Sequence, residues 1–218
     1  MDFFLNFDKK LEFMRKIVLS LMAVVAVVCS IGASAQFRYG PMIGVDITNL
    51  KFRQSLINVD QSVGFSAGLV TELMFPGIGF GINSGIYYEQ RGATLHLGEK
   101  YIWSSQGYGD ERSYLHYIEI PVHLRFKWTR MNGFEDTLAP FIYGGPSFSI
   151  LAGHSDVKAL KYAGGEMGLT LGIGVEIKHN WQLTGSYTWG MVYAEKTKLL
   201  DDFSAKNRTW DIRVSYLF

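Results

Sequence analysis

Acidic, basic and histidine side chains recur at every second position along several segments of this 218-residue chain. The clearest run holds Tyr117, Glu119, His123 and Arg125, which would all lie on one side of an extended strand. A histidine beside carboxylates can act as a general acid or base, so one interpretation is a catalytic or proton-handling site. The interpretation we favour is a paired network in a narrow interior, because buried charges require partners. The candidate polar residues are Glu72, Glu89, Tyr117, Glu119, His123, Arg125, Glu166, Glu176, Asp211 and Arg213.

The remaining motifs point to no cofactor and no metal. The 5 histidines form no pair two or four residues apart, the spacing that would place two ligands on one face of a strand or helix. The glycine-rich stretches at 77–81 and 172–174 continue a strand pattern instead of opening a helix, so they are not phosphate-binding loops. We therefore expect no enzyme active site.

The elements that carry these polar residues have a period of two. In the C-terminal segment, side chains that are polar except for Leu217 alternate with an apolar row formed by Trp210, Ile212, Val214, Tyr216 and Phe218. Successive side chains of a strand lie on opposite faces, so one face of this segment is apolar. Similar patterns recur upstream and predict eight strands, or ten if the long third connection contains a hairpin.

The distribution of polar and apolar residues favours a membrane barrel over a soluble one. The polar face carries many glycines and small residues, which suit a narrow interior, and aromatic residues gather at strand ends as in interfacial girdles. Segments of about ten residues match a tilted spanning strand. Long and short connections alternate, with short ones at 75–77 and 178–180, as in outer-membrane barrels. The prediction is an all-β, antiparallel up-and-down transmembrane β-barrel, and a soluble lipocalin-like carrier is an alternative.

The N-terminal region has the order of an export signal. A basic pair precedes an apolar run over residues 17–28, and small residues ending at Ala35 follow. This order predicts a signal peptide over residues 1–35, which is cleaved, and a barrel domain over residues 36–218. Met1 and Met14 are alternative starts. An even number of strands would place both termini in the periplasm, at the outer membrane of a Gram-negative bacterium.

Composition argues against an ordinary soluble domain and against a nucleic-acid binder. Hydrophobic residues make up 48% of the chain and charged residues 19%, below the roughly 25% that is usual for soluble domains. The formal net charge is +1, whereas nucleic-acid binders carry a basic excess, so we expect no nucleic-acid partner.

Three motifs occur in an order that resembles a known family. Residues 85–93 (GIYYEQRGA) are similar to a Y-x-x-x-G strand end, residues 115–125 (LHYIEIPVHLR) to a Y-L-E-I-P strand, and residues 139–146 (APFIYGGP) to a P-Y-x-x-x-G-P strand. Together they resemble the PorT-like family of outer-membrane β-barrel proteins. The resemblance implies an outer-membrane barrel of about eight strands. It implies little about activity, although one family member resembles a secretion-system component.

The last strand also resembles the assembly signal of outer-membrane proteins. That signal ends in an aromatic residue and has apolar residues at every second position before it, which the row from Trp210 to Phe218 matches. Such a strand can pair with an open sheet edge while its alternate side chains set the register. We therefore expect the barrel-assembly machinery to be a partner.

The expected role is structural or surface-binding. The long loop after the third strand contains Tyr101, Trp103 and Tyr108, and exposed aromatic residues in a long loop suit the binding of an unidentified surface ligand. Packing against neighbouring loops or lipopolysaccharide is the alternative for these residues. The expected partners are outer-membrane lipid and lipopolysaccharide. The alternative functions are a lipid-modifying enzyme, which needs Ser or Tyr beside His at the outer rim, and a narrow channel or secretion-associated porin-like protein.

Overall fold

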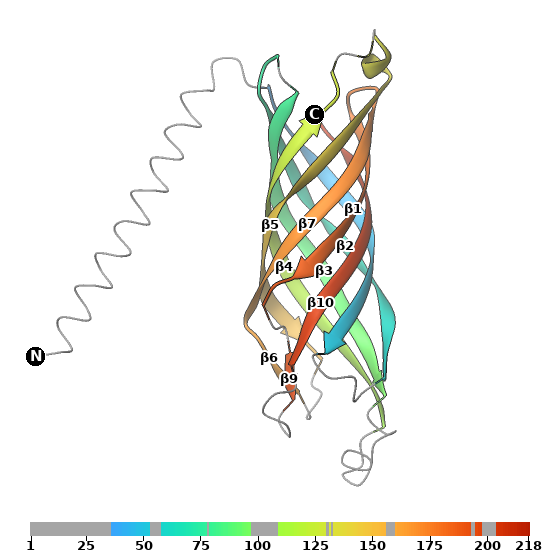
Figure 1. Ribbon diagram of the computed structural model, residues 1–218, viewed down its shortest axis with the longest axis vertical. Coiled ribbons are helices and arrows are strands. Elements are labelled where there is room, and N and C mark those ends of the chain that lie inside the picture. Colours follow the sequence, from blue (N-terminus) through green and yellow to red (C-terminus); the bar gives the residue numbers. More distant parts are fainter. Residues whose placement is uncertain are drawn as a thin grey trace, which may run out of the picture. The chain divides into compact units, whose positions relative to one another are not determined.

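Eight long antiparallel strands follow one another along the chain and close into a barrel (Figure 1). In the computed structural model they are β1 (Gln36–Phe52), β2 (Asn58–Met74), β3 (Phe80–His96), β4 (Asp110–Lys127), β5 (Leu138–His154), β7 (Gly165–Ile177), β8 (Trp181–Gly190) and β10 (Ser204–Tyr216). Each pairs with the next in this order, and β1 pairs with β10 from Met42 opposite Ser215 to Phe52 opposite Ala205. The predicted eight-stranded up-and-down barrel is confirmed.

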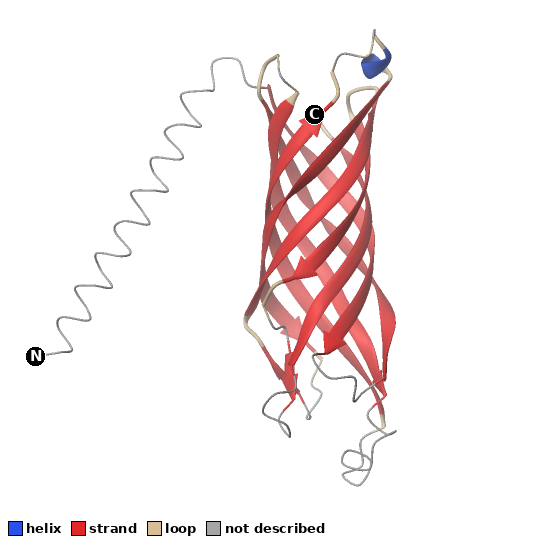
Figure 2. Cartoon of the chain, viewed as in Figure 1, coloured by secondary structure: helices blue, strands red, loops and turns tan. Residues whose placement is uncertain are grey.

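The structure describes residues 36–52, 58–77, 79–96, 109–129, 131, 133–155, 160–192, 195–197 and 204–218. Residues Phe37–Phe218 group into one unit through their contacts. The expected signal peptide at 1–35 and the loop aromatics Tyr101, Trp103 and Tyr108 lie outside the described residues. Within the described part, the sole helix is η2 (Phe134–Asp136), one short 3-10 turn (Figure 2). No helix in those ranges has the length and apolar character needed to cross a membrane.

The two ends of the barrel carry different connections. The turn end, at the top of Figure 1, holds the connections 75–79, 128–137 and 178–180 together with the start of β1 and Phe218. At the loop end, β1, β3, β5 and β8 end at Phe52, His96, His154 and Gly190. β1 extends to Phe52 and β2 begins at Asn58.

Two three-residue strands extend the sheet at the loop end. They are β6 (Leu160–Tyr162) and β9 (Glu195–Thr197), which pair with each other, and β9 also pairs with β10. They belong to the connections that follow β5 and β8. The ten-strand alternative placed its extra hairpin in the third connection, of which residues 97–108 lie outside the described residues.

Left-handed backbone conformations close two connections at the turn end. Gly77 and Gly79 have φ of 84° and 76°, and Lys178 and His179 have φ of 47° and 64°. Gly79 also approaches β4 closely, because a Cβ built on it would lie 2.3 Å from the carbonyl oxygen of Lys127. The carbonyl oxygen of Gly79 accepts a hydrogen bond from the backbone N–H of Lys127 at 2.7 Å. Glycine is therefore required at this position both for the backbone conformation and for the close approach.

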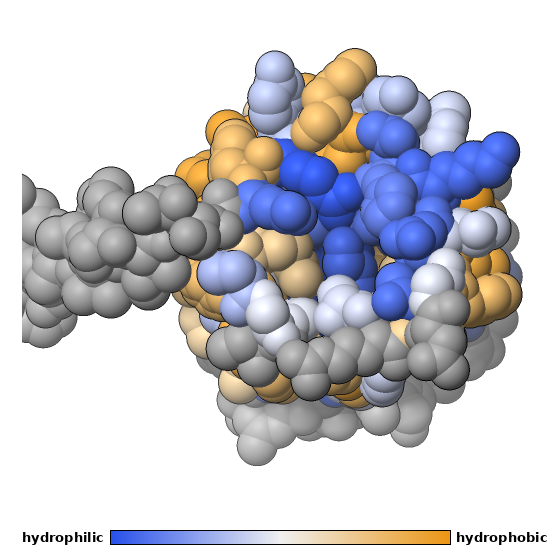
Figure 3. Space-filling view, turned by 90° about the horizontal axis from the view of Figure 1, so that it is seen from above, coloured by the Kyte–Doolittle hydropathy of each residue, from blue (hydrophilic) through white to orange (hydrophobic). Residues whose placement is uncertain are grey.

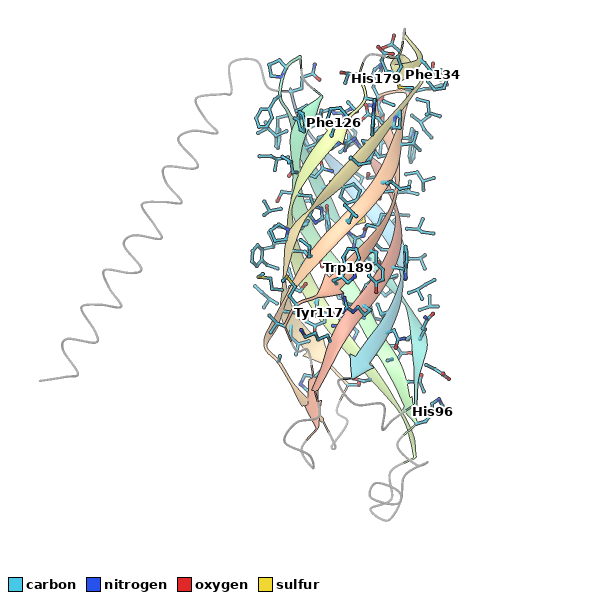
Figure 4. All side chains as sticks on the ribbon, in the orientation of Figure 1. His96, Tyr117, Phe126, Phe134, His179 and Trp189 are labelled. Carbon is cyan, nitrogen blue, oxygen red and sulfur yellow. The ribbon has the colours of Figure 1, made fainter. Side chains whose placement is uncertain are left out.

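The barrel wall has apolar side chains outside and polar ones inside. Leu171 and Ile173 on the outward face are 59% and 68% exposed, whereas Glu119 and Arg125 on the inward face are 1% and 0% exposed. Trp189, labelled on the wall in Figure 4, belongs to the outward rows. A soluble lipocalin-like carrier would bury Leu171 and expose Glu119 to water, so this distribution contradicts that alternative.

Candidate functional site

Ionic side chains cross the barrel interior at two levels. Seen from the turn end, hydrophilic side chains gather in the middle of the barrel and hydrophobic ones surround them (Figure 3). We call the level nearer this end the turn-end cluster, and it consists of Arg38, Glu72, Arg125, Lys127, Glu176 and Gln182. The next ionic level towards the loop end is the central cluster, and it consists of Asp46, Glu89, Arg91, Glu119, Glu166, Asp211 and Arg213.

Two glutamates organise the turn-end cluster. Glu72 on β2 lies 2.5 Å from Nη1 of Arg125 and 2.5 Å from Nη2 of Arg38. Glu176 on β7 lies 2.5 Å from the same nitrogen of Arg38 and 3.0 Å from Nζ of Lys127. Each carboxylate therefore meets at least two cations, which offsets the cost of removing its charge from water.

The central cluster is built around two guanidiniums and two carboxylates. Nη2 of Arg91 contacts both Glu89 and Glu119, and Nη2 of Arg213 contacts Glu89 and lies 4.0 Å from Glu119. Glu166 lies 3.4 Å from Nη1 of Arg91. The Coulombic attraction within such a buried pair is larger than at a solvated surface, and it opposes the cost of removing both charges from water.

Carboxyl groups outnumber guanidiniums in the central cluster by five to two. Neutral donors engage the carboxylates at its periphery. The hydroxyl of Ser186 donates to Asp211 at 2.7 Å, and the side-chain amide of Asn207 donates to Glu166 at 2.6 Å. The two arginines therefore carry most of the charge compensation at this level, and each has several carboxylate partners.

A less polar layer separates the two clusters. The ring of His123 lies against Tyr143, with centroids 5.4 Å apart, and the guanidinium carbon of Arg125 lies 3.4 Å from the centroid of Phe141. Nε2 of His123 has no hydrogen-bond partner within the described ranges. The catalytic interpretation paired a histidine with carboxylates, but His123 packs against an aromatic ring instead.

The ionic contacts join strands that are not neighbours in the sheet. Arg38 on β1 reaches Glu176 on β7, Arg213 on β10 reaches Glu89 on β3, and Arg91 on β3 reaches β7. The interior of an eight-stranded barrel is just wide enough for side chains to fill it. These bridges therefore cross the lumen, and the interior is a packed polar core.

All ten polar residues selected from the sequence have buried side chains on the inward face. Tyr117, the one aromatic residue among them, packs under the guanidinium of Arg91, 5.3 Å from the ring centroid. Four ionic residues of the two clusters were missed: Arg38, Asp46, Arg91 and Lys127. The period of two could have identified two of them, because Arg91 follows Glu89 by two residues and Lys127 follows Arg125 by two.

The interior supports electrostatic cross-linking of the wall. Among the described residues, no group of three or more His, Cys, Asp and Glu side chains could hold a metal ion. The glutamates of both clusters face guanidinium or ammonium groups and neutral donors. A substrate would have to displace these partners before it could reach a carboxylate.

The C-terminal strand presents its apolar row to the outside. Trp210 and Phe218 are 61% and 65% exposed, and the row also contains Ile212, Val214 and Tyr216. Leu217, the apolar exception on the other face, is fully buried and clusters with Met42, Val70 and Tyr87. Leu217 thus supplies apolar packing inside the barrel near its turn end.

One outward-facing pair has the composition that a lipid-modifying enzyme would need. The hydroxyl of Tyr88 on β3 lies 2.6 Å from Nδ1 of His116 on β4, and the two rings stack with centroids 5.9 Å apart. Phe65 on β2 packs against Tyr88 at a centroid separation of 5.4 Å. The same contacts also suit an aromatic cluster on the outer wall.

The connection between β4 and β5 contains one carboxylate with a perturbed pKa. Hydrogen bonds from the backbone N–H groups of Glu135 itself, Met131 and Gly133 stabilise the ionised carboxylate and lower the pKa of Glu135. The last two bonds are each 2.9 Å long. They tie the short η2 segment to the chain that precedes it, at the turn end where Figure 4 labels Phe134 and His179.

A closed barrel with an apolar exterior and a polar, ion-paired interior defines an integral outer-membrane β-barrel protein, because the strand ladder closes between β1 and β10 and the exterior matches hydrocarbon. The chain belongs to the family of outer membrane protein beta-barrel domains, whose sequence model matches residues 32–192. The family and the fold together confirm the predicted outer-membrane barrel.

The chain is also similar, at low sequence identity, to several solved structures. The outer membrane protein OprG from Pseudomonas aeruginosa is 15% identical, with a TM-score of 0.49 over 85% of this chain and 96% of that one. Ail, the attachment invasion locus protein of Yersinia pestis, is 15% identical in its complex with the heparin analogue sucrose octasulfate, with a TM-score of 0.43 over 84% and 99%. Neisserial surface protein A is 14% identical, with a TM-score of 0.43 over 83% and 98%. No curated protein sequence matches the chain.

Proposed function

We propose that this protein is a sealed outer-membrane barrel with a structural or surface-binding role, and that it neither conducts ions nor catalyses a reaction. The observation that supports this most directly is the set of ion pairs that cross the lumen at two levels, such as Arg38 with Glu176 and Arg213 with Glu89. An ion entering the lumen would have to break these pairs in a space already filled by side chains.

Conductance across a planar bilayer tests the sealed lumen. The purified protein, shown to be folded by heat-modifiable gel migration, is expected to give no current above the lipid background. A porin reconstituted in parallel confirms that insertion and detection work. Discrete channel openings by the wild-type barrel would overturn the proposal and favour the narrow-channel or secretion-associated alternative.

The proposed orientation places both termini and the turn end in the periplasm, after removal of residues 1–35. Mass spectrometry of the mature protein is expected to find Gln36 at its N-terminus. Single cysteines at Gly109 and His179, both exposed and at opposite ends of the barrel, test the orientation. A membrane-impermeant maleimide should label only the variant at Gly109 in intact cells, and the reverse labelling would overturn the orientation.

We assign the surface-binding role to the loop end and the assembly role to the C-terminal strand. Tyr101, Trp103 and Tyr108 belong to the longest sequence-predicted loop, so they are the residues we propose for contact with a surface ligand or lipopolysaccharide. The outward row that ends at Phe218 suits recognition by the barrel-assembly machinery. Within the barrel family, we propose that the chain is a member of the PorT-like group, and the resemblance of its three ordered motifs supports this.

A lipid-modifying enzyme is the second candidate, and the hydrogen bond between Tyr88 and His116 is the observation that favours it. A nucleophile and its base must lie within hydrogen-bond reach of each other, and Tyr88 and His116 meet this condition. Incubation with phospholipid and with lipid A, followed by mass spectrometry of the lipids, tests it. Activity that disappears in Tyr88→Phe would establish the enzyme, whereas unchanged lipids with the wild type support the sealed scaffold.

A further inference from the structure

The lipid-facing wall contains a groove on its outer surface. It has a volume of about 570 Å³ and lies across β5, β7, β8 and β10. Trp128 and Pro140 line the part nearest the turn end, and Ile142, Ile173 and Ile212 line the part further along the wall. The groove is therefore a depression in the surface that meets hydrocarbon, distinct from the polar interior.

A missing side chain at Gly185 on β8 creates the groove. Strand register places Gly185 directly between Ile173 on β7 and Ile212 on β10, so all three occupy outward positions. A Cβ built on Gly185 would meet only the backbone oxygen of Asp211, at 3.9 Å, which means that no neighbour fills the space. Ile173 and Ile212 are 68% and 63% exposed and stand on either side of the gap.

We propose that this groove binds one acyl chain of a phospholipid. Its lining side chains are apolar apart from Thr184, and it opens onto the face that contacts lipid chains. A single flexible acyl chain can lie between the projecting side chains of Ile173 and Ile212, over Gly185. Packing contacts, and not the hydrophobic effect, would hold it there, since surrounding lipid is equally apolar.

The ends of the groove set the position of the lipid headgroup. Trp128 lies at the turn end of the groove, and tryptophan favours the interface between hydrocarbon and headgroups. The exposed Lys178 follows β7 by one residue in the adjacent turn and can attract a phosphate. The choice of phospholipid over lipopolysaccharide rests on the proposed orientation, in which the turn end faces the periplasmic leaflet.

Native mass spectrometry of the barrel extracted in mild detergent tests the proposal. The wild type should retain one phospholipid, and Gly185→Leu, which fills the groove, should retain about tenfold less. Thr71→Leu, which adds the same side chain to the outward face of β2, should retain lipid as the wild type does. Heat-modifiable migration checks that each variant is folded, and Gly185→Ala, a smaller change, should give a partial loss if Gly185→Leu does not fold.

Equal lipid retention by the wild type, Gly185→Leu and Gly185→Ala would overturn the proposal. So would a wild type that retains no lipid but is a dimer that Gly185→Leu converts to a monomer, because a second copy would then occupy the groove. Retention of lipopolysaccharide in place of phospholipid would overturn the assigned leaflet and the occupant together. None of these outcomes depends on whether the lumen conducts ions.

Discussion

Arg91 compensates three buried carboxylates, so its loss should destabilise the barrel strongly. Its guanidinium contacts Glu89 and Glu119 and lies 3.4 Å from Glu166, and its side chain is only 2% exposed. Arg91→Met keeps an unbranched apolar stem but removes the guanidinium, and it leaves Arg213 as the one cation of the central cluster beside five carboxyl groups. Removal of one partner from a buried ion pair costs about 3–5 kcal/mol, because an uncompensated charge stays buried. We therefore expect Arg91→Met to lower the free energy of unfolding by about 3–5 kcal/mol.

Urea unfolding in phospholipid vesicles measures the effect. Tryptophan fluorescence and heat-modifiable migration follow the transition, and linear extrapolation gives the free energy of unfolding in water. Arg208→Met, on the outward face of β10 opposite Trp189, is the matched control and should change stability by less than about 0.5 kcal/mol. Glu119→Gln removes one of the five carboxyl groups of the central cluster, so it should lower the free energy of unfolding much less than Arg91→Met does. When it is added to Arg91→Met, it should recover about 0.5–3 kcal/mol of the lost free energy of unfolding.

A small effect would refute the reasoning. Exposed ion pairs contribute only about 0.2–1 kcal/mol, so a loss in this range for Arg91→Met would mean that water screens the cluster and that the lumen is not sealed. Acidification supplies a second criterion. Protons can neutralise the carboxylates that Arg91→Met leaves unpaired, so the stability deficit relative to the wild type should narrow as the pH falls. A deficit that widens on acidification would contradict the buried-charge explanation.

Three further substitutions test the wall, the turn and the last strand. Leu171→Arg places a charge on the lipid-facing side of β7 and should lower the free energy of unfolding by about 2–4 kcal/mol, whereas Leu171→Met should cost less than about 1.5 kcal/mol in the same urea titration. Gly79→Ala should lower the free energy of unfolding more than Gly77→Ala does, because both glycines have positive φ but only a Cβ at Gly79 would meet the carbonyl oxygen of Lys127. Equal losses in the two variants would contradict this. Phe218→Ser should reduce the folded fraction in cell membranes by gel migration but not refolding of purified protein into detergent, and equal losses in both would refute a role in assembly.

The sequence by itself determines which face of each strand meets lipid. In the last strand, the apolar row from Trp210 to Phe218 is outward, and Asp211 and Arg213 between them are buried. This information is local, because successive side chains of any strand must lie on opposite faces whatever the neighbouring strands are. The number of such segments predicts the eight strands of the closed barrel, and their inverted polarity predicts the membrane.

Strand length is decided by the tertiary structure. The alternating segments suggest about ten residues each, the length that crosses hydrocarbon, but β3 and β4 have 17 and 18 residues. Beyond the hydrocarbon layer an outward side chain can be polar as well as apolar, so the alternation fades there. The backbone hydrogen bonds between β3 and β4 continue regardless, from Phe80 opposite Phe126 to His96 opposite Asp110.

The partners of each buried charge are also decided only by the tertiary structure. The period of two places Glu89, His123 and Arg213 on inward faces, but it does not place Arg213 against Glu89, which is 124 residues away in the chain, or His123 against Tyr143. Contacts across a lumen depend on the stagger between strands and on the closure of β1 against β10. The alternation within a single strand specifies the direction of a side chain but not its height in the barrel. It therefore reveals neither the stagger between strands nor the closure of the barrel.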